Sequence, residues 1–172
     1  GAISKNQGNG ILETVINILL AAEGKLIVFW PSISEENIIK ALKSNISIVA
    51  SDGPTYNLAD AKDGYLSHPR SFGCFPKILS RYVREKNSIS LEEAIKKMTA
   101  LPALKAGLPY RGVIRQGFFA DITIFNQNTI KDIASFENPF QYAQGINSVI
   151  INGQVALLKG EIKNLGLGYI LK

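Results

Sequence analysis

Cysteine and long apolar runs are what this sequence most clearly lacks. Cys74 is the one cysteine among 172 residues, so an intrachain disulfide is excluded. A lone thiol is typical of a protein kept in a reducing, cytoplasmic compartment. No apolar run approaches the roughly 18 residues that a membrane span requires, and the first residues lack the pattern of a secretory signal. We therefore expect a soluble cytoplasmic protein with no membrane partner.

A strong charge of one sign is also lacking. The net charge is +5, and the basic residues in the middle of the chain fall at helix-surface spacings, with Glu85, Glu92 and Glu93 among them. These basic residues are Lys77, Arg81, Arg84, Lys86, Lys96, Lys97, Lys105, Arg111 and Arg115. They do not form a compact basic cluster interleaved with aromatic residues. We expect a solvated face and no nucleic-acid partner.

The composition is that of a protein with a real core. Of the 172 residues, 46% are hydrophobic and 19% are charged, as in one globular domain or two small ones. The chain opens with Gly1-Ala2 and has no initiating Met. We expect either a processed protein or an expressed piece of something longer.

Helical and strand patterns alternate over the first part of the chain. Apolar spacing predicts helices over 11–20, after Ser34, over 75–84 and after Ser90. Both serines suit the N-cap position, and Ser90 forms a capping box with Glu93. Continuous apolar runs at 25–30 and 46–52 predict strands that are covered on both faces. This order predicts parallel β/α units.

The rest of the chain has the pattern of β-structure. Residues 118–125 alternate as a strand, and residues 149–158 form a hairpin pattern around Asn152-Gly153, a pair that suits a type I′ turn. Between them, the aromatic stretch 135–145 is non-periodic and predicts an ordered loop. We expect a boundary near residue 108, which gives domains of 1–108 and 109–172.

Asp52 is the leading candidate for a catalytic residue. It follows the predicted buried strand, and α/β folds place their chemistry at the carboxyl ends of such strands. The alternative is that Asp52-Gly53-Pro54 is only a turn, since these three residue types are common in turns.

Several motifs in order give the chain a family resemblance. Residues 111–125 (RGVIRQGFFADITIF) and 149–153 (VIING) resemble the C-terminal β-segment of the amidohydrolase superfamily. With Ser51-Asp52-Gly53, the His68-Pro69-Arg70 block and residues 90–99, the chain resembles the last third of N-acyl-D-amino-acid deacylases, or D-aminoacylases. The resemblance implies the last β/α units of a TIM-type (β/α)8 barrel, followed by the C-terminal strands of a small β-sandwich domain. A whole barrel takes about 250 residues, so this chain cannot contain one.

The resemblance also implies roles for three residues. Asp52 would be the general base of a zinc-dependent amide hydrolase and a potential metal contact, whereas His68 and Arg70 would bind the carboxylate of an N-acyl amino acid substrate. A loop-stapling role for the His68-Pro69-Arg70 block is the open alternative. A zinc site normally needs three protein ligands, and His68 is the one histidine here. We therefore expect zinc in the complete enzyme, and neither tight zinc binding nor activity in this chain alone. Cys74 is given no role.

Two other functions fit the same residues. One is a relative that acts on cyclic amides, such as a hydantoinase or dihydroorotase, and the other is a non-catalytic module kept for assembly or binding. In every case two barrel units would expose apolar surface and strand edges. We expect self-association, or pairing with the missing N-terminal part.

Overall fold

The computed structural model describes residues 1–29, 32–56, 58–61 and 67–171. Its chain divides into two compact units, Gly1–Ser32 and Ile33–Lys172. None of the described helices combines the length and apolarity that a membrane crossing requires.

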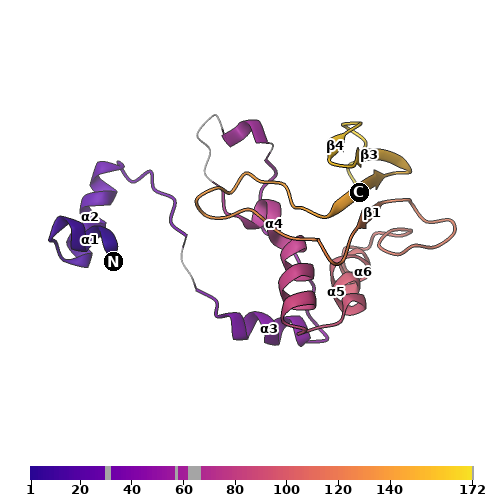
Figure 1. Cartoon of the computed structure of the whole chain (residues 1–172), viewed down its shortest axis with the longest axis horizontal. Coiled ribbons are helices and arrows are strands. Elements are labelled where there is room, and N and C mark those ends of the chain that lie inside the picture. Colours follow the sequence, from indigo (N-terminus) through magenta and orange to yellow (C-terminus); the bar gives the residue numbers. More distant parts are fainter. Residues whose placement is uncertain (30–31, 57, 62–66, 172) are drawn as a thin grey trace. The chain divides into compact units, whose positions relative to one another are not determined.

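The first unit consists of two helices and the segment after them (Figure 1). Helix α1 spans Ala2–Gln7 and α2 spans Ile11–Ala21, which confirms the helix expected at 11–20. Gly24, at φ 74°, follows in a left-handed conformation that glycine adopts without strain. The strand expected at 25–30 is wrong for residues 25–29, which belong to no strand, and Trp30 lies outside the described residues.

The second unit begins with a helix and a segment without regular structure. Helix α3 spans Glu35–Lys43, and its cap is as expected, because the Ser34 hydroxyl accepts a hydrogen bond from the backbone N–H of Asn37 at 3.3 Å. The strand expected at 46–52 is not formed. A strand is stabilised by backbone hydrogen bonds to a neighbouring strand. Here the N–H of Val49 instead donates to the carbonyl of Lys97 in helix α5.

A long helical rod follows the short 3₁₀ helix η1, Leu58–Ala61. Helix α4 spans Arg70–Lys77 and continues directly into the π-helix η2, Ile78–Glu85. The start expected for this helix, at residue 75, is wrong, because α4 begins at Arg70 and Pro76 lies inside it. Proline lacks an N–H and crowds the carbonyl of residue i−4, which accounts for the wider π-type winding that follows it.

Two shorter helices complete the helical part. Helix α5 spans Leu91–Met98 and α6 spans Ala100–Lys105. The Ser90 hydroxyl accepts from the N–H of Glu93 at 3.1 Å, so the expected N-cap is confirmed. The expected solvated face is wrong at Lys97, which is 0% exposed.

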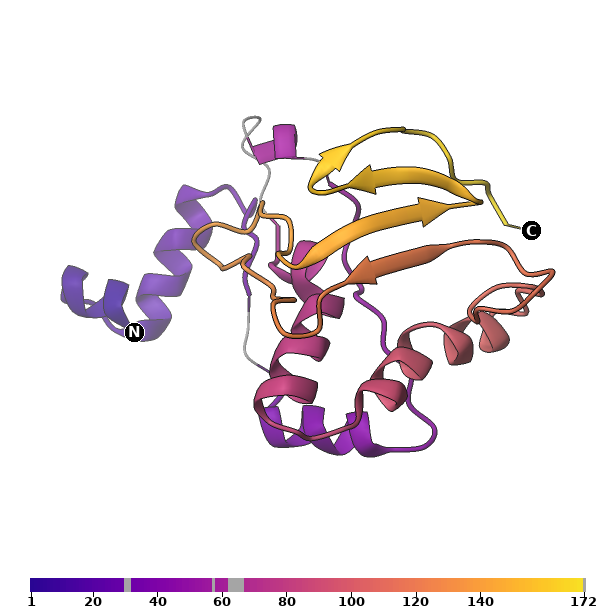
Figure 2. The ribbon, with the colours of Figure 1, turned by 45° about the vertical axis from the view of Figure 1, so that its right-hand side comes forward.

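The described strands form one antiparallel sheet in the order β1-β2-β3-β4 (Figure 2). Their bounds are Ile122–Phe125, Ile146–Ile151, Gln154–Leu158 and Glu161–Ile162. The hairpin turn is confirmed, with Asn152 at φ 49° and Gly153 at φ 79°. The strand expected at 118–125 is shorter, because the N–H of Phe118 closes a turn onto Arg115. No parallel strand pair occurs among the residues described, so the expected β/α units are present here as helices without their strands.

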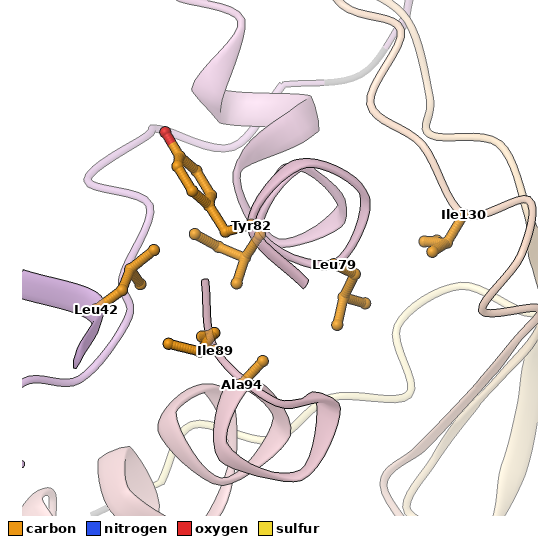
Figure 3. Packing of buried hydrophobic residues seen from close by; sticks show 7 residues of the cluster. Leu42, Leu79, Tyr82, Ile89, Ala94 and Ile130 are labelled. Carbon is orange, nitrogen blue, oxygen red and sulfur yellow. The ribbon is translucent and has the colours of Figure 1, made fainter. Parts of the chain in front are cut away.

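The core lies where η2 meets α3, α5 and the loop after β1 (Figure 3). Its buried members are Leu42, Ile78, Leu79, Tyr82, Ile89, Ala94 and Ile130. Burying a side chain of this size contributes about 1.5–3 kcal/mol. This packing fixes the helix whose first turn carries the candidate site.

Candidate functional site

Asp52 stands at the end of the segment that links α3 to the site. Its side chain is 89% exposed, and its backbone is left-handed, at φ 49°. Only a few per cent of non-glycine residues have a positive φ, and Asp and Asn are enriched among them. The conformation fits a turn and also fits a functional residue held in a strained position.

Arg70, the first residue of α4, meets Asp52. Its Nη2 lies 3.0 Å from Asp52 Oδ2, so the structure brings together two of the residues singled out in the sequence. A guanidinium has five N–H donors. The contact with Asp52 leaves further donors that can bind a second carboxylate in the same plane.

His68 adjoins this pair through the backbone. Its Nδ1 accepts the N–H of Arg70 at 3.0 Å, and its ring meets Phe136 edge-on at a centroid distance of 5.0 Å. Burial lowers the pKa of His68, and the positive charges of Arg70 and Lys77 lower it further. A neutral imidazole that accepts at Nδ1 carries its proton at Nε2.

The support of the site was not foreseen from the sequence. A Cβ added to Gly53 would lie 2.9 Å from the Cα of Ser71, so glycine alone allows this approach of the two backbones. Ser67 is 4% exposed, and its hydroxyl donates to the Ser71 hydroxyl at 3.1 Å. The Asp52-Gly53 sequence was a usable signal, whereas nothing in the sequence marks Ser67 or Ser71.

Aromatic residues of the 135–145 loop cover the side of α4. Phe72 packs against Phe140 and Tyr142 at centroid distances of 5.6 and 5.8 Å, and Tyr56 meets Phe140 at 5.6 Å. Just before this loop in the chain, Asp132 accepts a hydrogen bond from the Ser80 hydroxyl at 3.1 Å. The expected ordered loop is confirmed, and it forms an apolar wall beside His68.

Cys74 also contacts the Asp52 segment. Its Sγ lies 3.6 Å from the carbonyl oxygen of Ala50, and burial raises the pKa of the thiol. A half-buried thiol with a raised pKa is a poor nucleophile. Cys74 therefore acts here as a packing residue.

The donor set does not form a zinc site by itself. In the part of the chain that is described, no three His, Cys, Asp or Glu residues gather closely enough to hold a metal ion. Zinc takes at least three protein ligands in catalytic sites. Asp52 could supply one ligand at most.

The middle and later parts of the chain match a known protein family. The model of the amidohydrolase family matches residues 56–157, more than half of the chain. The chain therefore belongs to the amidohydrolase family.

The chain is similar to proteins named as D-aminoacylase and N-acyl-D-amino-acid deacylases. D-aminoacylase from Alcaligenes xylosoxydans xylosoxydans is 45% identical over 86 residues, and N-acyl-D-aspartate deacylase from the same organism is 46% identical over 87 residues. These matches cover 50% and 51% of this chain, and 18% of each relative. The chain thus spans about a fifth of their length.

Solved structures agree with this placement. A D-aminoacylase studied for its binuclear metal centre matches with a TM-score of 0.68 and 34% identity, over 76% of this chain and 26% of the enzyme. N-acyl-D-glutamate deacylase from Bordetella bronchiseptica, solved with zinc and a phosphonate inhibitor, matches with a TM-score of 0.69 and 30% identity, over 90% and 30%. The expected family resemblance is confirmed.

Proposed function

We propose that this chain is the C-terminal part of a zinc-dependent amide hydrolase that releases D-amino acids from N-acyl-D-amino acids. The observation that carries the proposal is the ion pair between Asp52 and Arg70, in a chain whose structure is similar to a D-aminoacylase. The chain alone is expected to be inactive, because it covers only 18% of the relatives that it matches.

In the proposed arrangement, residues 1–108 supply the last β/α units of the barrel and 109–172 supply C-terminal strands of the β-sandwich. The apolar segments 25–29 and 46–50, which form no strand in the described part of the chain, suit this role. In a complete barrel each would lie between parallel neighbours. Asp52 would then stand at a strand's carboxyl end, where barrel enzymes place their chemistry.

Asp52 is proposed as the general base. An exposed carboxylate can accept a proton from the water that attacks the amide carbonyl and return it to the leaving amine. This removes the need for a free hydroxide ion at neutral pH. Proton transfer of this kind is typically worth about 10²- to 10⁴-fold in rate.

Arg70 and His68 are proposed to bind the substrate carboxylate. The free donors of the Arg70 guanidinium could form the paired, charge-assisted hydrogen bonds that a carboxylate prefers. His68 holds the first turn of α4 through its bond to the Arg70 N–H and so keeps Arg70 in place for the substrate. Asp52 would then be oriented by the same guanidinium that orients the substrate.

Zinc belongs to this proposal as the cofactor of the complete enzyme. There it would polarise the amide carbonyl and make water a better nucleophile. The described residues supply too few ligands to retain the ion. We therefore expect far less than one zinc ion per chain in a metal analysis after dialysis. One zinc ion per chain would contradict this expectation, because the described residues do not account for such a site.

The proposal can be tested in a hybrid enzyme. This chain would replace the matching 30% of the Bordetella bronchiseptica deacylase, a match that covers 90% of this chain. The zinc-loaded hybrid should hydrolyse N-acetyl-D-amino acids and leave N-acetyl-L-amino acids intact. Hydrolysis of hydantoin or dihydroorotate instead would favour a cyclic-amide enzyme. A folded, zinc-loaded hybrid without either activity would indicate a non-catalytic module and contradict the proposal.

A further inference from the structure

Lys97 is the largest fully buried side chain in the described part of the chain, at 0% exposure. It lies in α5, far in sequence from the three candidate site residues. Burying an ammonium group costs several kcal/mol unless strong partners replace its water. An apolar side chain of similar length would fill the same space without that cost, so the polar end of Lys97 needs an explanation.

The partners of Lys97 come mainly from one short segment. Its Nζ donates to the carbonyl of Ser44 at 2.6 Å, and to the carbonyl and the hydroxyl of Ser47 at 3.0 Å each. Glu93 Oε1 lies 3.5 Å away on the same helix. The three donors of an ammonium are thereby matched to three oxygen atoms of the turn after α3.

The backbone of Lys97 holds the same segment. Its carbonyl accepts the N–H of Val49 at 3.1 Å. Asp52 follows Val49 by three residues, and three residues of chain reach at most about 10 Å. Lys97 therefore fixes the start of a short tether that ends at the carboxylate.

Helix α4 holds the other end of that tether. Ala50 accepts from the Cys74 thiol, Gly53 packs on Ser71, and Asp52 pairs with Arg70. Two separate helices thus clamp residues 44–53, with α5 at one end and α4 at the other. If the clamp at Lys97 is released, the α4 contacts alone remain, and the exposed ion pair among them is worth only about 0–1 kcal/mol.

We propose that Lys97 is a positioning residue, which holds residues 44–49 so that the Asp52 carboxylate meets the Arg70 guanidinium. The catalytic meaning of this geometry rests on the proposed function, but the clamp itself does not. The two can therefore fail separately.

The clamp can be measured on the chain as it exists, because the segment contacts its one cysteine, which is half-buried. In Lys97→Met, Cys74 should react with a thiol reagent about tenfold faster or more, as expected for the loss of hydrogen bonds to a charged group. Lys96→Met is the matched control, since Lys96 is its exposed neighbour and pairs with the same Glu93. The faster reaction should persist at low denaturant, where global unfolding does not contribute.

A second readout follows the ion pair itself. Asp52→Asn should shift the NMR signal of the Arg70 guanidinium, Lys97→Met should shift it in the same direction, and Lys96→Met should leave it unchanged. Ser47→Ala, which removes one of the three acceptors, should give a smaller change of the same sign if Lys97→Met does not fold. Cys74 reactivity and an Arg70 signal that both stay as in the wild type would overturn the proposal. An inactive hybrid enzyme with an intact clamp would instead count against the proposed function.

Discussion

Asp52 combines a left-handed backbone with an almost fully exposed carboxylate. Left-handed geometry costs a typical residue roughly 1–2 kcal/mol, and less for Asp or Asn. Such strain is often found at functional sites, where the surroundings hold a residue in place. Here two contacts hold Asp52 in place: the close packing of Gly53 on Ser71, and the ion pair of Asp52 with Arg70.

His68 gives a direct test of the environment at the residue scale, because it is the one histidine of the chain. Burial, Arg70 and Lys77 all disfavour its charged form, so its pKa should lie below the usual value of about 6.5 in an NMR titration. Arg70→Met should raise the pKa towards that value, whereas Lys105→Met, an exposed position in α6, should not change it. An unshifted pKa in the wild type would contradict the described surroundings.

The lowered pKa of His68 makes the stability of the fold depend on pH. The folded state binds the His68 proton more weakly than the unfolded chain does, so protonation favours unfolding. The stabilising contribution is present above about pH 6.5 and is lost as the pH falls through the folded-state pKa. In urea unfolding measured across this pH range, the free energy of unfolding should therefore fall less for Arg70→Met than for Lys105→Met.

The sequence indicated three candidate site residues but not the contacts between them. Asp52, His68 and Arg70 have marked chemistry, whereas the pairing of Asp52 with Arg70 is a tertiary contact that local sequence patterns do not reveal. Lys97 was expected on a solvated surface because its spacing fits one. Its burial follows from three acceptors in a distant turn, which no local pattern reveals.

Among the elements, local signals predicted helices and turns better than strands. Ser34, Ser90 and Asn152-Gly153 act through hydrogen bonds and backbone angles within a few residues, and all are confirmed. The strands expected at 25–30 and 46–52 depend on distant partners for their ladders, and those partners do not occur among the described residues. Helix α4 begins earlier than expected because Pro76 is accommodated by the π-helical turn instead of marking a helix start.

The loop between β1 and β2 can be tested at Gly145. Its φ is 82°, and an added Cβ would lie 2.5 Å from the backbone of Ile130, which is 2% exposed. Gly145→Ala should therefore lower the free energy of unfolding by more than about 3 kcal/mol, or prevent folding. Gly166→Ala is the control, because its φ of 73° is similar but its surroundings are open. It should cost only about 1–2 kcal/mol. Equal losses in urea unfolding would contradict the described packing of the loop.

At the scale of the whole molecule, apolar surface remains uncovered. Helix α2 exposes 74% of Leu12 and 73% of Leu20, and the neighbouring Ile11 is 68% exposed. An apolar helix face of this kind is normally covered by another surface. In the proposed complete enzyme the preceding barrel units would cover it, and in the isolated chain we expect a second copy to do so.

We therefore expect the isolated chain to form dimers or larger assemblies at micromolar concentration in light scattering. Leu12→Lys combined with Leu20→Lys should shift it towards the monomer, because each lysine places a charge on the apolar face. Leu104→Lys is the control, since Leu104 is 78% exposed in α6. A wild-type chain that is monomeric throughout would refute the expectation.

Asp52 is the proposed general base, and one measurement in the active hybrid tests this role most directly. Asp52→Asn keeps the side-chain volume and suits the left-handed backbone, but it removes the group that accepts the proton. The kcat should fall about 10²- to 10⁴-fold, while KM and thermal stability should change little, because the side chain is exposed. Glu36→Gln, at an exposed acid in α3, should keep the wild-type kcat. A zinc-loaded Asp52→Asn hybrid with the wild-type kcat would show that Asp52 is a turn residue and not the base.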